Sequence, residues 1–143
     1  MLFSRSTEYA IRAMVYLSSL KAGELAGARE ISEAESIPMP FLWKILHMLA
    51  RQRLVRSFKG LHGGYELAVG ADRVSLSTIV SVADGNEFRD RCVLGLPECS
   101  SRHPCPLHEQ WKGIRTDLAC MLDQTSLADL AQVTRKKAPR KRK

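Results

Sequence analysis

Apolar residues recur at helical spacing near the start of the chain. Between residues 6 and 22 they fall three or four positions apart, which predicts a helix that Ser6 caps and Gly23 stops. One face of this helix and one face of the helix expected after Pro40 are apolar. We expect the following side chains in the core: Ala10, Ala13, Met14, Leu17, Leu20, Phe41, Leu42, Ile45, Leu46 and Leu49.

The next two helical segments are short and adjacent. Residues 28–35 form the first, and Pro38 and Pro40 open the second, which continues to about residue 52. Proline suits the first turn of a helix, where its missing N–H would be unpaired in any case. Two short helices joined by a turn at residues 36–39 are typical of a helix-turn-helix.

The hydrophobic pattern then changes to alternation. Residues 54–58 and 65–69 alternate between apolar and polar, and a glycine-rich segment at 59–64 separates them, which predicts a β-hairpin. Glycine in that connection permits a positive φ or a close approach to another backbone. A hairpin directly after a helix-turn-helix is the wing of a winged helix. A short helix at 76–84, ended by Gly85, completes this part.

The second half of the chain begins with an aperiodic stretch and ends in helices. Residues 89–106 contain three cysteines and three prolines and predict an irregular loop. Beyond it, apolar residues are spaced four, three, four and three apart, as in a helix that packs against a partner helix. These seam residues are Leu107, Trp111, Ile114, Leu118 and Met121. They predict a homodimer, with packing back onto the chain's own domain as the alternative.

The predicted fold class is therefore mainly α with a small β-hairpin. A winged helix-turn-helix DNA-binding domain at residues 1–86 is followed by a cysteine-bearing loop at 87–106. The long C-terminal dimerisation helix and a terminal helix from Leu127, capped by Ser126, span 107–134. A basic disordered tail is expected at 135–143.

The charge distribution favours nucleic acid as the partner. Of the 143 residues, 22 are Lys or Arg and 15 are Asp or Glu. The last nine residues include seven basic and no acidic side chains, so the rest of the chain has 15 of each sign. Within it, residues 44–59 hold five basic residues and no acid, a local cationic surface of the kind that meets phosphate.

Several other classes are disfavoured. We find no nucleophile–base pair and no paired carboxylates, and residues 59–64 do not match the G-x-x-x-x-G-K-[ST] phosphate loop. We therefore expect no enzyme and no small-molecule substrate. The start of the chain lacks the features of a signal peptide, and no stretch reaches the ~18 apolar residues of a membrane span. These observations predict a cytoplasmic protein without a membrane partner.

The cysteines form the pattern Cys-x6-Cys-x5-Cys-x2-His, which comprises Cys92, Cys99, Cys105 and His108. The close C-x2-C pairs of a zinc ribbon or finger are absent. Three thiolates on a loop suit an iron–sulfur cluster, whose ligand positions lie further apart than those of one metal ion. The alternatives are a thiol switch without a cluster, merely tolerated thiols, and a zinc-binding structural module.

A cluster needs a fourth ligand. His108, His103 and Glu8 are candidates. His108 follows Cys105 by three residues, so one helical turn brings both to a common point. Glu8 would reach the loop of the other subunit in a dimer. Cys120 lies on the predicted seam helix but off the seam, and we expect it to be a small, partly buried residue.

A family resemblance brings these features together. The run IPMPFLWKILHMLARQRLVRSFKGLHGGYELA from Ile37, STEYAIRAM at 6–14, the three-cysteine loop and SLADLA near the end resemble the Rrf-type family of bacterial winged-helix regulators, which includes IscR, NsrR and RirA. The resemblance extends from residue 1 to about 133. It implies a homodimeric transcription factor whose cluster state sets its affinity for DNA.

The resemblance also assigns ligands. It makes Cys92, Cys99 and Cys105 the cluster thiolates, matches His108 to the IscR-type histidine, and places Glu8 where the NsrR type has an acidic residue. A [2Fe–2S] cluster is favoured, with [4Fe–4S] as the alternative. The x6 gap differs from the x5 of most IscR and NsrR types. In the recognition helix, Pro40, Trp43 and Lys44 replace more polar residues of the IscR type, including its glutamate at the position of Trp43, so the operator sequence should differ.

The expected partner is double-stranded DNA with a palindromic operator. Each subunit would lay the helix from Pro40 in a major groove, with half-sites roughly 34–36 Å apart. The wing would enter the adjacent minor groove, which attracts cationic side chains. We expect DNA contacts from Pro40, Trp43, Lys44, His47, Arg51, Arg56, Ser57, Lys59, Gly60, His62, Gly63 and Gly64, with packing in the core as the alternative for Trp43.

Overall fold

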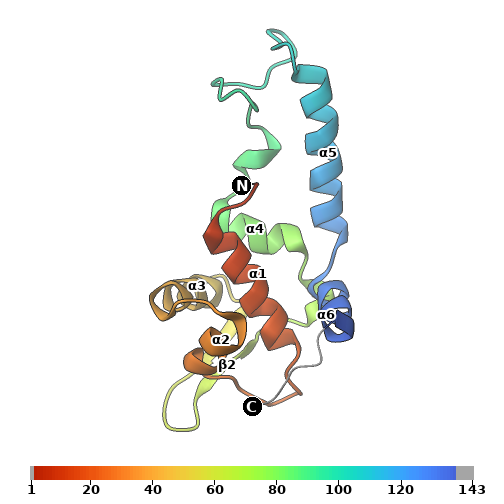
Figure 1. The fold of residues 1–143 in the computed structure, drawn as a ribbon. Helices are drawn as coiled ribbons and strands as arrows, with labels where there is room; N and C mark the ends of the chain where they lie inside the picture. The colour runs from red at the N-terminus through yellow and green to blue at the C-terminus, as the bar shows by residue number, and fades with distance from the viewer. Residues whose placement is uncertain (1, 138–143) are drawn as a thin grey trace.

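The computed structural model describes residues 2–137 and consists of helices with one small hairpin (Figure 1). In that part of the chain the elements are α1 (Arg5–Ser18), α2 (Ala28–Glu35), α3 (Met39–Arg51), β1 (Val55–Phe58), β2 (Gly64–Leu67), η1 (Ala71–Arg73), α4 (Leu76–Asp84), η2 (Glu87–Arg89), α5 (His108–Gln124) and α6 (Leu127–Lys137). The order confirms the predicted fold class.

Helix α1 lies at the centre of the molecule. It packs against α2, α3, β2, α4 and α6. The predicted bounds of this helix were wrong at both ends. Ser4 rather than Ser6 is the N-cap, because its hydroxyl accepts from the Thr7 N–H. The helix ends at Ser18, where the side-chain hydroxyls of Ser18 and Ser19 bond backbone carbonyls one turn earlier and compete with further helix formation.

The predicted helix-turn-helix is present as α2 and α3. Ser36 adopts a left-handed conformation that ends α2, and Pro38 is the N-cap of α3. The expected core face of α3 is confirmed for Leu42, Ile45, Leu46 and Leu49. Phe41 was wrongly expected in the core. It is 51% exposed, because it precedes the buried i, i+3, i+4, i+7 stripe by one residue. Its ring lies beside that of Tyr9, with 6.2 Å between the ring centroids.

The hairpin is built on two glycines with little room around them. The strands β1 and β2 pair antiparallel, with Phe58 opposite Gly64. A Cβ at Gly63 would lie 2.1 Å from the Phe58 carbonyl oxygen, and one at Gly64 would lie 2.9 Å from that of Ala26. Ala26 and Tyr65 exchange two backbone hydrogen bonds there, which anchor the hairpin to the body. The predicted close backbone approach is thus confirmed.

Helix α5 rises away from the body, with the irregular loop beside its first turns (Figure 1). Its far end joins the body through a backbone pairing between Ser75 and Ser126. Ser126 caps α6, as predicted, by accepting from the Asp129 N–H. Helix α6 continues to Lys137, three residues into the segment expected to be a tail, since Lys and Arg favour helix. The rest of that segment lies outside the described residues.

We predict that Gly63→Ala distorts the wing. The added methyl group cannot fit beside the Phe58 carbonyl oxygen, so the free energy of unfolding should fall by about 1–3 kcal/mol. Gly113→Ala is the matched control, because a Cβ at this site in α5 meets nothing within 4 Å. It should raise stability by about 0.5–1 kcal/mol. Urea unfolding of both variants measures the difference, and equal stabilities would refute the close contact.

Candidate DNA-binding surface and cysteine site

The outer face of α3 presents the predicted recognition residues to solvent. Pro40, Trp43, Lys44, His47 and Arg51 are all exposed. Trp43 is 56% exposed, which rules out the alternative that it completes the core. The buried residues of α3 hold the helix on the body, so this face is free to enter a groove.

The wing lies beside α2 and α3, at the end of the molecule opposite the cysteine loop (Figure 1). Ser57, Lys59, Gly60 and His62 are exposed, and Leu61 at its tip is 94% exposed. Arg56 extends across the hairpin to Glu66, with 3.1 Å between the guanidinium and the carboxylate. This ion pair offsets the positive charge of Arg56 at the base of the wing.

Two of the wing glycines, Gly63 and Gly64, have a structural role in the hairpin. The Gly63 N–H already donates to the Gly60 carbonyl at 3.0 Å, so it is not free to bind a phosphate. Gly64 is buried in the hairpin. Both glycines shape the wing, because neither has room for a side chain. Gly60, at φ 102°, remains exposed at the turn.

The cysteine loop places its thiols near the start of α5. Cys105 donates a hydrogen bond towards the Cys92 sulfur. The Cys99 sulfur lies 3.5 Å from Nδ1 of His108. The His108 backbone N–H donates to the Cys105 carbonyl at 3.0 Å, which links the two pairs. The structure thus brings Cys92, Cys99, Cys105 and His108, four of the six candidate ligands, to the end of the molecule where α5 begins.

Cys92 is buried, and the backbone N–H groups of Leu94 and Leu96 point at its sulfur. These hydrogen bonds, with smaller ones from Cys105 and Gly95, lower the pKa of the Cys92 thiol below its ordinary value, although burial opposes them. Donors of this kind favour a thiolate, the form that binds metal.

His108 is the first residue of α5 and is 4% exposed. Both ring nitrogens have neighbours: Nδ1 faces Cys99, and Nε2 lies 3.3 Å from the Ser101 hydroxyl. Ser101 was not singled out from the sequence. A hydrogen bond at one ring nitrogen fixes the tautomer and leaves the other nitrogen available to a metal.

The remaining candidates lie apart from these pairs. Glu8 is exposed in the first turn of α1, and His103 is exposed in the loop. Cys120, expected to be partly buried, is exposed on α5. Within residues 2–137, no three of the His, Cys, Asp and Glu side chains are arranged to hold a single metal ion. The donors form two pairs rather than one tetrahedron.

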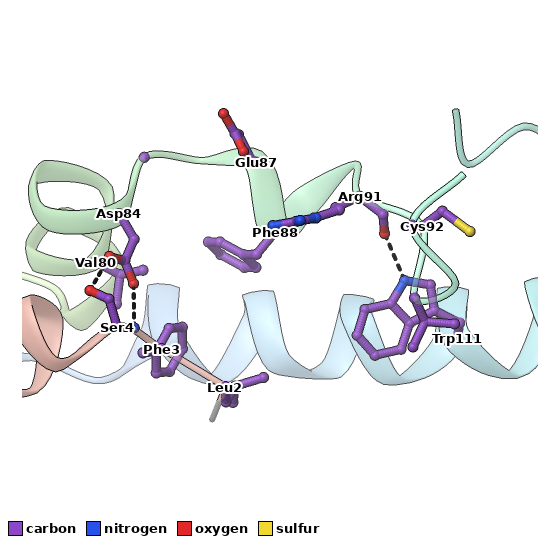
Figure 2. A pocket seen from close by; sticks show the side chains of 13 residues that line it. Leu2, Phe3, Ser4, Val80, Asp84, Glu87, Phe88, Arg91, Cys92 and Trp111 are labelled. Atoms are coloured by element: carbon purple, nitrogen blue, oxygen red, sulfur yellow. Dashed lines mark hydrogen bonds between the residues drawn. The ribbon is translucent and has the colours of Figure 1, made fainter. Parts of the chain in front are cut away.

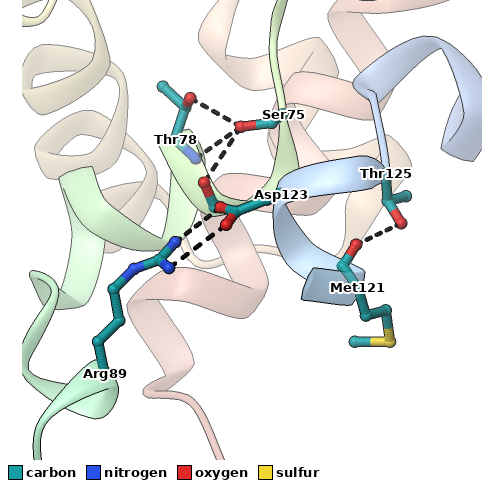
Figure 3. Close-up of polar contacts among 7 residues, drawn as sticks. Ser75, Thr78, Arg89, Met121, Asp123 and Thr125 are labelled. Atoms are coloured by element: carbon teal, nitrogen blue, oxygen red, sulfur yellow. Dashed lines mark hydrogen bonds and ion pairs between the residues drawn. The ribbon is translucent and has the colours of Figure 1, made fainter. Parts of the chain in front are cut away.

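Two contacts fasten the start of the cysteine loop to α5. The Trp111 indole N–H donates to the Arg91 carbonyl at 2.8 Å (Figure 2). In the last turn of α5, Asp123 forms an ion pair with Arg89 of η2 at 2.6 Å (Figure 3). Hydrogen bonds from Arg89 and then Ser77 lower the pKa of Asp123. No sequence pattern pointed to Arg89 and Asp123, which are 34 residues apart.

The predicted seam of α5 divides into two faces. Trp111 and Leu118 turn partly towards the chain's own loop and body, together with the buried His108 and Leu122. Leu107, Ile114 and Met121 are exposed and spaced exactly seven residues apart. A helix with one apolar residue in each heptad along an outward edge still presents a stripe to a partner.

The fold and its exposed surfaces define the class of protein. A helix-turn-helix followed by a hairpin wing, with basic residues on both, is a winged-helix DNA-binding module. Within residues 2–137, the helices are too short or too polar to span a bilayer.

Comparison with known proteins gives the family. Residues 3–133 match the Rrf2 family, described as iron-dependent transcriptional regulators, and the chain belongs to this family. An HTH-type transcriptional regulator of Mycobacterium tuberculosis is 36% identical over 134 residues, which cover 92% of this chain and 81% of the relative. IscR of Sodalis glossinidius is 26% identical over 122 residues, which cover 85% of this chain and 73% of that IscR. The relatives are transcription regulators, not enzymes.

A solved structure supports the same assignment. CymR, the global cysteine regulator of Bacillus subtilis, matches with a TM-score of 0.77 and 26% sequence identity. The alignment covers 92% of this chain and 96% of CymR. The winged-helix arrangement expected from the sequence is therefore confirmed.

Proposed function

We propose that the protein is a homodimeric, cytoplasmic transcription regulator whose operator affinity is set by an iron–sulfur cluster bound at Cys92, Cys99 and Cys105. The observation behind the proposal is the convergence of these thiols and His108 on the first turn of α5. The family description as iron-dependent regulators supports the same chemistry.

The donor set fits a cluster in kind. Three thiols and one imidazole lie in two neighbouring pairs, and backbone N–H groups already surround the Cys92 sulfur. Hydrogen bonds to sulfur are among the factors that set a cluster's reduction potential. When bound, a cluster supplies a centre that can change its oxidation state or be lost.

His108 is the fourth ligand that this geometry favours. Its Nδ1 already faces Cys99, and Ser101 can hold the proton on Nε2. Histidine ligation raises the potential relative to thiolate ligation and allows it to depend on pH. Glu8 remains the alternative, which requires α1 of a second subunit.

The dimer forms through α5 in this proposal. Leu107, Ile114 and Met121 give it an exposed apolar edge along its length. Pairing of two such helices places two copies of α3 on one duplex, so the operator is palindromic with half-sites about 34–36 Å apart. The spacing of the two recognition helices then depends on how the two α5 helices pack.

Each subunit contacts DNA with α3 and the wing. Lys44, His47 and Arg51 line the outer face of α3 and meet bases or phosphates in the major groove. Lys59 and His62 extend from the wing towards the minor groove. Trp43 offers an apolar contact to a thymine methyl group. Residues 138–143 add four more basic residues to the chain for salt-sensitive binding.

A second candidate is a thiol switch without a cluster. The hydrogen bond from Cys105 that helps to lower the pKa of the Cys92 thiol favours it, because this bond brings two thiols within reach of each other. In this case the protein would be colourless and would bind DNA without iron.

We predict that protein purified without oxygen is brown and contains iron and acid-labile sulfide in equal amounts. Cys99→Ala should lose most of both, since it removes a ligand at the Cys99–His108 pair. Cys120→Ala is the matched control, because this exposed cysteine lies outside both pairs and should leave the metal content unchanged. Visible absorption with iron and sulfide assays measures all three proteins.

The same experiment separates the candidates. Colourless wild-type protein that binds its operator without iron would exclude the cluster and favour the thiol switch. Bound zinc without sulfide would instead indicate the structural zinc module.

We predict that Lys44→Ala weakens operator binding and reduces its salt dependence. Loss of one phosphate contact should lower the slope of log K against log salt by about 0.9 for each subunit. Lys112→Ala is the control, because Lys112 is also an exposed lysine but lies on α5. Fluorescence anisotropy at several salt concentrations gives the affinities and slopes, and identical affinities and slopes for wild type and Lys44→Ala would remove Lys44 from the interface.

A further inference from the structure

Trp111 makes a specific contact with the cysteine loop. Its indole Nε1–H donates to the backbone carbonyl of Arg91, the residue directly before Cys92, at 2.8 Å (Figure 2). One turn further along α5, the Arg115 guanidinium approaches the same carbonyl at 3.4 Å. Side-chain hydrogen bonds from α5 therefore hold the backbone directly before Cys92 against this helix.

The same face of α5 also holds the middle of the loop. His108, Trp111 and Arg115 stand at positions i, i+3 and i+7, which share one face of a helix. His108 contacts Cys99 and Ser101, while the other two contact Arg91. Two separate parts of the cysteine loop thus contact one face of α5. A rearrangement of the thiols would therefore alter the contacts of that face.

A cavity beside Trp111 leaves room for movement. It has a volume of about 670 Å³ and lies between the N-terminal segment, α4, η2 and α5 (Figure 2). Phe3, Phe88, Cys92 and Trp111 are among its lining residues. The cavity is open to solvent, so the indole and the Cys92 segment can shift here without displacing the core.

We propose that Trp111 is the positioning residue that couples the Cys92 end of the loop to α5. It moves with the Arg91 carbonyl when the thiols change state, and it passes that displacement to the helix that carries the dimer edge. This role rests on the proposed function in one respect, that the loop is the sensing element. It applies equally to cluster binding and to thiol oxidation.

The first test follows the indole directly. The chain has two tryptophans, so nitrogen-15 spectra contain two indole N–H signals, and the Trp43→Phe variant assigns them. Spectra are compared for reduced protein and for protein treated with diamide, both diamagnetic. Two thiols become one disulfide, and diamide takes up the two electrons and two protons as its hydrazine form. Thiol counting confirms that two thiols are lost.

We expect the Trp111 signal to move on oxidation while the Trp43 signal stays in place. A Trp111 signal that is unchanged in fully oxidised protein would overturn the coupling. Movement of both signals by the same amount would also contradict it, because that result indicates a global rearrangement.

The second test removes only the donor. Trp111→Phe keeps an aromatic ring and loses the N–H, whereas Thr116→Val removes a 2.8 Å hydrogen bond of α5 that leads to Lys112 and does not touch the loop. Operator affinity is measured for chelator-treated protein and for protein reconstituted with ferrous iron and sulfide. It is measured again for the reduced and diamide-treated forms.

In Trp111→Phe, the ratio of affinities between the two states should fall by about three- to tenfold, the range expected for loss of one hydrogen bond. Thr116→Val should keep the wild-type ratio. A wild-type ratio in Trp111→Phe would exclude the coupling role. If the wild-type protein binds the operator with equal affinity in both states of each pair, the proposed function fails. The indole spectra alone then decide whether Trp111 follows the loop.

Discussion

Burial of one face of α1 is the constraint on which the rest of the molecule depends. Ala10, Ala13 and Met14 are fully buried, and the two alanines allow neighbouring helices to approach closely. Helices α3, α4 and α6 and the strand β2 all pack on this helix. Burial of Met14 and Leu17 contributes about 1.5–3 kcal/mol each. The recognition helix is held in place because its buried residues share this core.

The cysteine loop and the wing lie at opposite ends of the molecule (Figure 1), so in the proposed function a signal from the loop has to pass through the elements between them. The junction after α5 provides one connection. The Leu76 N–H donates to Thr125, and the Leu127 N–H donates to Val74, which fixes the end of α5 to the start of α4. Helix α4 contacts α1 and α3 in turn. A tilt of α5 would act on α3 by this route and, in the proposed dimer, through the second subunit.

Local patterns predicted most of the fold. The predicted bounds of the helices at 28–35 and 76–84 were correct, because the apolar periodicity and the residues at the helix ends indicate the same bounds in both segments. The start of α1 depends on a partner 80 residues away: the Ser4 N–H donates to Asp84 at 2.9 Å, which no local pattern reveals. The same holds at the site. Spacing predicted that Cys105 and His108 lie within one helical turn, but the thiol that faces the His108 ring is that of Cys99, and Trp111 was assigned only to the seam. Both contacts depend on how the loop folds back.

The central claim is that the state of the cysteine loop sets operator affinity. The most direct test selects the operator from random duplexes with the full-length protein. The dissociation constant of the protein–operator complex is then measured without oxygen, for one preparation before and after a chelator removes iron from the cysteine loop. The account predicts at least about a tenfold change, which corresponds to about 1.4 kcal/mol of coupling. Equal affinities in the two states, in protein shown to gain and lose iron and sulfide, would contradict it.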